Sequence, residues 1–85
     1  MAIHFATAQV NIGTTATLLL AARATRTRVR IHKGTATLFL GNSNGVTISN
    51  GYQITTEEYE FFPTDDIYAI CQGSARVIQV LEEYS

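Results

Sequence analysis

The segment TLFLGNSNGVTISNGYQI, residues 37–54, organises the rest of the sequence around it. It begins with Thr-Leu-Phe-Leu, which we interpret as a β-strand whose leucines face one side and whose threonine and phenylalanine face the other. The alternation stops at Gly41, and strand-forming residues resume at Tyr52. Glycines and asparagines fill the interval, and both residue types tolerate left-handed backbone. The segment therefore predicts two strands joined by a loop that contains several tight turns.

The clearest period-two pattern precedes this segment, at residues 23–32. Strict alternation predicts a strand with one buried and one outward face. The predicted inner face carries Thr27, Val29 and Ile31. The predicted outer face carries Arg26, Arg28, Arg30 and His32.

Lys33 and Gly34 fit a two-residue hairpin turn in which glycine adopts a positive φ. Such a hairpin would pair the arginine strand with residues 36–40 and would place Phe39 outward, beside Arg28. An outward aromatic side chain next to arginine is typical of a contact surface. We therefore expect this hairpin to present a basic and aromatic face.

Residues 2–12 read as an arm that leads into a strand. The other segments read as short strands, at residues 14–22, 55–62, 67–71 and 75–81. A helix competes at 14–22 because leucine and alanine favour helices, but threonines favour a strand there. Gln72-Gly73 predicts a second hairpin turn, and the adjacent Val77 and Ile78 indicate a bulge or a strand covered on both faces. Strands at a spacing of roughly 8–12 residues predict an antiparallel all-β sandwich or small barrel of about seven or eight strands. The whole chain, 1–85, forms this single domain, with residues 1–8 as a candidate N-terminal arm.

Composition narrows the classes of function. The 85 residues are 46% hydrophobic and only 15% charged, which indicates a folded domain. A net charge of -1 argues against a general nucleic-acid binder. The single cysteine, Cys71, excludes an internal disulfide, and its apolar surroundings predict a buried thiol. No apolar run approaches the ~18 residues of a membrane-spanning helix, and the N-terminus shows no secretory signal.

The outer arginine row is the strongest candidate site. Arginines two apart on a strand could bind phosphate or an acidic partner, but a solvated strand face, or a face that protects a sheet edge from aggregation, is the leading alternative. The predicted interface comprises Arg26, Arg28, Arg30, His32, Phe39 and Tyr52. The acidic group comprises Glu57, Glu58, Glu60, Asp65 and Asp66, without the spacing of a calcium loop. His4 and His32 lack a nucleophile motif, so we predict no catalytic residue, no metal and no cofactor.

Five short turn-and-strand motifs lie between residues 40 and 82: Leu40-Gly41, Gly45-Val46-Thr47, Ser49-Asn50-Gly51-Tyr52, Ile67-Tyr68-Ala69-Ile70 and Val80-Leu81-Glu82. Together they resemble a pattern found in small virion proteins of tailed bacteriophages. The resemblance covers roughly residues 28–82. The chain departs from the pattern at residues 55–57, where that family has a Pro-Gly-Glu-like turn, and it carries an extra residue near 76–78.

The resemblance implies a structural role without enzyme activity. It implies a capsid decoration (cement) protein on the phage head, bound to the major capsid protein or another virion protein. It also implies a homo-oligomer, with a trimer favoured by the symmetry axes of shells. A tail or fibre attachment module that binds carbohydrate is the first alternative, and a small nucleic-acid-binding protein is the second.

Overall fold

The computed structural model describes residues 4–85, and these residues form eight β-strands and no helix. The strands are β1 (His4–Ile12), β2 (Thr17–Leu20), β3 (Arg26–His32), β4 (Leu38–Gly41), β5 (Tyr52–Ile54), β6 (Glu58–Phe61), β7 (Ile67–Cys71) and β8 (Arg76–Tyr84). The predicted all-β class and strand number are confirmed. The segment at 14–22 contains a strand, as its threonines predicted. The predicted arm is wrong for residues 4–8, which belong to β1, and residues 1–3 lie outside the described part.

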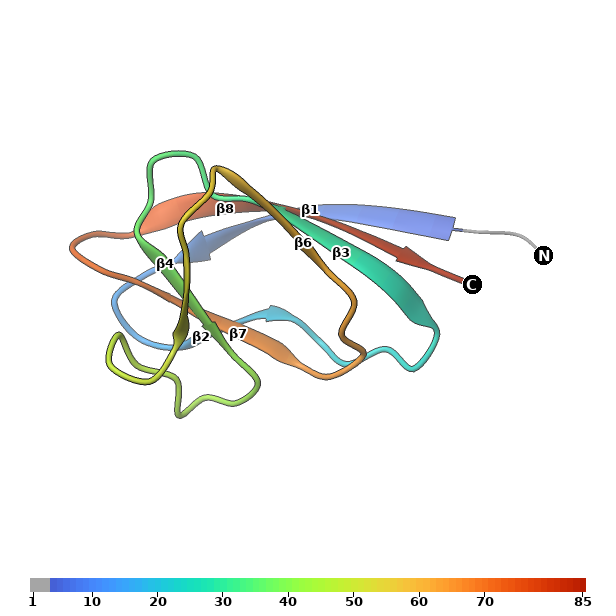
Figure 1. Cartoon of the computed structure of the whole chain (residues 1–85), viewed down its shortest axis with the longest axis horizontal. Coiled ribbons are helices and arrows are strands. Elements are labelled where there is room, and N and C mark those ends of the chain that lie inside the picture. The colour runs from blue at the N-terminus through green and yellow to red at the C-terminus, as the bar shows by residue number, and fades with distance from the viewer. Residues whose placement is uncertain (1–3) are drawn as a thin grey trace.

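The strands form two four-stranded antiparallel sheets that pack face to face (Figure 1). Sheet A has the order β1-β8-β3-β6, and sheet B has the order β2-β7-β4-β5. The inner faces of both sheets supply the main core, in which Val29, Ile31 and Leu38 are completely buried. Alternation in β3 and β4 therefore predicted these core residues correctly.

The strands pair outward from the loop at residues 41–51. β4 pairs with β5, β3 with β6, β2 with β7 and β1 with β8. The chain thus forms one long antiparallel ribbon of paired strands. The four strand pairs lie alternately in sheet B and sheet A, beginning with the hairpin β4–β5 in sheet B and ending with β1–β8 in sheet A. This is the strand order of an eight-stranded jelly roll. The start of β1 and the end of β8 consequently lie at the same end of the molecule, opposite the loop (Figure 1).

The two predicted hairpins are wrong. Gly34 and Gly73 do adopt positive φ angles, 62° and 94°, so the tight turns are present. However, the first turn joins β3 in sheet A to β4 in sheet B, and the second joins β7 in sheet B to β8 in sheet A. A turn motif specifies a local reversal and does not specify which sheet receives the next strand. Because β3 pairs with β6 and β8, neither of its edges is free for β4.

The loop at 41–51 folds back over the outer face of sheet B. Val46 is buried there against Phe39 and Ile70, forming a second, smaller core. A Cβ atom on Gly41 would lie 2.7 Å from the Val46 Cβ, and one on Gly51 would lie 2.8 Å from the Phe39 Cβ. The glycines are therefore needed for close approach. Neither glycine has a positive φ, so the prediction that they supply left-handed backbone is wrong at these two positions.

An asparagine holds this loop in shape. The Asn50 Oδ1 atom accepts a hydrogen bond from the Thr47 amide at 2.7 Å. The Asn50 side-chain amide in turn donates to the Gly45 carbonyl at 3.2 Å. Three of the five sequence motifs singled out above, those between residues 40 and 52, thus lie in or beside this loop. Their residue types are explained by how the loop closes over Phe39.

Candidate functional site

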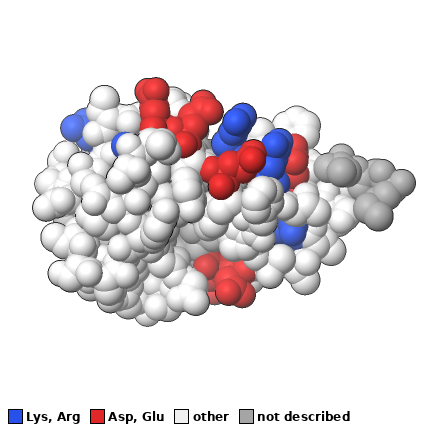
Figure 2. All heavy atoms as spheres, viewed as in Figure 1, with Lys and Arg blue, Asp and Glu red and all other residues white. Residues whose placement is uncertain are grey.

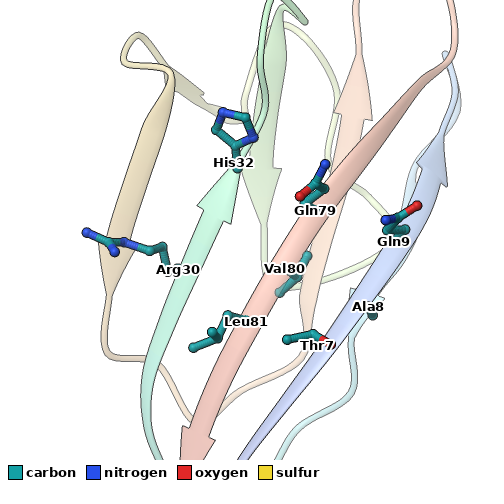
Figure 3. Close-up of a pocket in the computed structure, with 8 residues that line it drawn as sticks. All are labelled: Thr7, Ala8, Gln9, Arg30, His32, Gln79, Val80 and Leu81. Atoms are coloured by element: carbon teal, nitrogen blue, oxygen red, sulfur yellow. The ribbon is translucent and has the colours of Figure 1, made fainter.

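The outer face of sheet A contains three of the four residues of the predicted arginine row. Arg30 and His32 line a depression of about 460 Å³, and Arg28 lies further along the same strand. Thr7, Gln9, Gln79 and Leu81 line the same depression from β1 and β8 (Figure 3). The alternation in β3 therefore predicted the shared face of Arg28, Arg30 and His32 correctly.

The arginines on this face are neutralised within the chain. Arg28 donates to the Glu60 carboxylate at 2.9 Å and to the Glu83 carboxylate at 2.8 Å. Its pKa is raised chiefly by the hydrogen bond to Glu83. Arg30 lies 3.8 Å from Glu58. These carboxylates come from β6 and β8, which flank β3, and Figure 2 shows acidic and basic side chains alternating along this side.

Arg26 does not lie on the outer face, contrary to the prediction. Its side chain has no exposed surface, and its Nε atom donates to the Glu82 carboxylate at 2.8 Å. The same guanidinium donates to the carbonyl oxygens of Pro63, Asp65 and Ala21. The register of β3 against β8 shifts between Arg26 and Arg28, and this bulge turns Arg26 inward. Thr27 is exposed instead, and its hydroxyl donates to the Glu83 carbonyl.

Phe39 is also placed differently from the prediction. It does point away from the main core, but only 8% of it is exposed because the loop at 41–51 covers it. It does not lie beside Arg28, since β3 and β4 belong to different sheets. Phe39 is thus a core residue of the loop, and the exposed aromatic and basic surface predicted from the hairpin does not exist.

Tyr52 lies in a separate groove and does not join the arginine row, since it belongs to β5 of sheet B whereas the row lies on the outer face of sheet A. It is 62% exposed, and its ring centroid is 5.8 Å from that of Tyr59. Tyr59 in turn lies 5.2 Å from Phe61. Burial raises the pKa of Tyr59, and its hydrogen bond to Tyr52 adds to this effect. The groove encloses about 260 Å³ and is lined by these three rings and by Asp65 and Asp66, among others.

An uncharged patch on β1 and β8 was missed by the sequence analysis. By strand alternation, its members share the outer face of sheet A: Phe5, Thr7, Gln9, Asn11, Val77, Gln79 and Leu81. Glu83, opposite Phe5 on the same face, is paired with Arg28 and ends the patch on β8. Phe5 is 68% exposed and Val77 is 57% exposed. Both predicted alternatives at Val77 and Ile78 are wrong: β1 and β8 pair in continuous register there, so no bulge is present, and the exposure of Val77 shows that the strand is not covered on both faces. Val77 interrupts the apolar alternation of β8 because it is an apolar residue on the exposed face. This interruption was the feature of the sequence that could have revealed the patch.

The acidic group is divided between two regions. Glu57 lies 3.8 Å from His32, and Asp66 accepts a hydrogen bond from the Ala22 amide at 2.7 Å. Within residues 4–85, no three His, Cys, Asp or Glu side chains are grouped as a metal site. The described residues also include no helix long and apolar enough to cross a membrane.

The thiol of Cys71 lies in the main core, where the residue is only 1% exposed. Burial raises its pKa, and this effect outweighs the opposing influence of Arg76. Because the thiolate is the reactive species, we expect a thiol reagent to modify the native protein far more slowly than the urea-unfolded protein at pH 8. Equal labelling rates in the two states would contradict this placement.

Family models, curated proteins and solved structures were compared with the chain, and no match was found in any of the three.

Proposed function

We propose that this chain is a structural component of a tailed-phage virion, a capsid decoration protein that binds the head shell as a homo-oligomer. The five sequence motifs support the phage origin. The uncharged patch on β1 and β8 is the observation that carries the proposal, because it offers a surface for binding another protein. The predicted arginine row plays a lesser part, since its charges are paired within the chain.

The patch shares with interface centres a depletion of charged residues, and it carries an exposed apolar side chain at each end, Phe5 and Val77. Interface cores are depleted of charged residues and enriched in aromatic side chains, whereas the rim is polar. Phe5 and Val77 are large apolar side chains that are mostly exposed and contribute little to the core of this domain. The ion pairs of Arg28 and Arg30 border the patch on the β3 side, as a polar rim would. Burying Phe5 and Val77 against a partner would remove both from water.

The groove at Tyr52 favours a second candidate function, a virion module that binds carbohydrate during attachment. Aromatic rings combine an apolar face with polar atoms, and pockets of this kind fix a ligand with a few polar groups. Here Tyr52, Tyr59 and Phe61 supply the rings, while Asp65 and Asp66 supply carboxylate oxygens. This candidate would use the side of the sandwich where β5 and β6 lie.

Fractionated phage particles test the proposal. A decoration protein is expected in purified heads, in a constant and high ratio to the major capsid protein. An attachment module would instead remain with isolated tails or fibres at low copy number, and that result would favour the second candidate.

Variants then test the patch itself. Phe5→Ser and Val77→Ser are expected to reduce binding to heads that lack the protein by ~10-fold or more, as for central interface residues. Phe62→Ser is the matched control, since Phe62 is also 68% exposed but follows β6, outside the patch. Equal binding by all three variants would show that the patch is not the contact surface.

A further inference from the structure

Strand β1 is the free edge of sheet A. One side of β1 pairs with β8 along all nine residues, and no other described strand pairs with its opposite side. The sequence of the strand, HFATAQVNI, contains no proline and no Asp, Glu, Lys or Arg. Soluble proteins normally protect such edges with charges, proline or very short strands, because the unpaired backbone groups can recruit another strand.

The other three edges of the sandwich have the protection that β1 lacks. β6 carries Glu58 and Glu60 and is followed by Pro63. β5 has three residues. β2 has four, and its register is interrupted between Leu18 and Leu20. Among the described strands, β1 alone is therefore both long and unprotected.

We propose that β1 pairs antiparallel with β1 of a second copy across a two-fold axis, joining two A sheets into one eight-stranded sheet. Two identical edge strands related by a two-fold axis always meet antiparallel. Full overlap of the nine residues places Ala8, the middle residue, on the axis. In that register Ala6 faces Val10 and Thr7 faces Gln9.

The residue pairs in this register favour a second copy of the chain as the partner of the β1 edge. Charges of one sign on such a strand would lie near the same charges of the second copy and repel them, and β1 carries no Asp, Glu, Lys or Arg. In the centre of this register Ala6 meets Val10 and Ala8 meets Ala8 on one face, and Thr7 meets Gln9 on the other, while the outer pairs are mixed, with Phe5 facing Asn11 and His4 facing Ile12. Ala6 and Val10 are half-buried in the single chain, and Ala8 is exposed. The pairing would also make the uncharged patches of the two copies continuous.

This interface is closed by its symmetry, so it forms a dimer and does not by itself form the trimer implied by the resemblance. The inference does not rest on the proposed role in the virion. A β1-paired dimer could exist whether or not the patch binds a phage head.

Complementary charges at position 8 test the interface. Ala8→Lys and Ala8→Glu each place like charges opposite each other on the axis, so each variant alone is expected to be a monomer by sedimentation velocity. An equimolar mixture is expected to recover dimers that contain one copy of each variant. Thr35→Lys and Thr35→Glu are the controls, since Thr35 is exposed in the turn before β4, and both are expected to stay dimeric like the parent.

A second measurement does not depend on any variant. In the parent protein, amide hydrogen exchange of β1 is expected to slow as protein concentration rises through the dimerisation range, while exchange of β6 stays unchanged. A monomeric parent at all soluble concentrations would overturn the inference. So would a dimer or trimer that both Ala8 variants leave intact. Either result would leave the head-binding test of the patch variants unaffected.

Discussion

Replacing Arg26 by leucine is expected to lower the free energy of unfolding by about 3–5 kcal/mol, the usual cost of removing one member of a buried ion pair. The Arg26 side chain is completely buried, and it joins Glu82 of β8 to the carbonyls of three residues in the connections between strands. Without it, the buried Glu82 carboxylate keeps only Arg23, whose side chain is 39% exposed, at 3.1 Å. Urea unfolding followed by circular dichroism measures the loss.

Two further variants separate the buried pair from a general charge effect. Arg30→Leu removes an exposed arginine of the same strand, 3.8 Å from Glu58, and is expected to cost less than about 1 kcal/mol. The double variant Arg26→Leu, Glu82→Leu removes both charges and is expected to be more stable than Arg26→Leu alone. If Arg26→Leu lowers the free energy of unfolding no more than Arg30→Leu does, the buried Arg26–Glu82 ion pair contributes nothing to stability.

Replacing Val29 by aspartate is expected to abolish folding. Val29 has no exposed surface and lies in the middle of β3, which pairs with β6 on one side and β8 on the other. A buried carboxylate without a partner costs several kcal/mol, and the total stability of a small domain is only about 5–15 kcal/mol. Circular dichroism and thermal melting of the purified variant test this expectation directly.

Thr27→Asp is the matched control for Val29→Asp. Alternation alone places Thr27 and Val29 on the same buried face, whereas the structure places Thr27 in water beside the bulge. The control is therefore expected to fold with a loss of about 1 kcal/mol or less, as for other surface changes. If both variants unfold, Thr27 is buried and the bulge is misplaced. If Val29→Asp folds normally, the register of β3 is wrong.

The sequence determined the strands and most of their buried faces, because these depend on local order along the chain. Period-two alternation identified β3 and β4, and it assigned Val29, Ile31 and Leu38 to the core before any pairing was known. Apolar surroundings identified Cys71 as buried. Glycine at the two turns correctly marked where the chain reverses, since a positive φ is a local requirement.

Only the tertiary structure decided which strands are neighbours, because the pairing of β1 with β8 or of β3 with β6 joins residues far apart in sequence. That choice overturned the predicted hairpins and separated Phe39 from Arg28. It also placed Glu60 and Glu83 beside Arg28, so that charges predicted to meet a partner meet each other. A one-residue bulge against β8 buried Arg26, and a loop folded over sheet B buried Phe39. The free edge of β1 follows from the same pairing, since a strand becomes an edge only when the positions of the others are known.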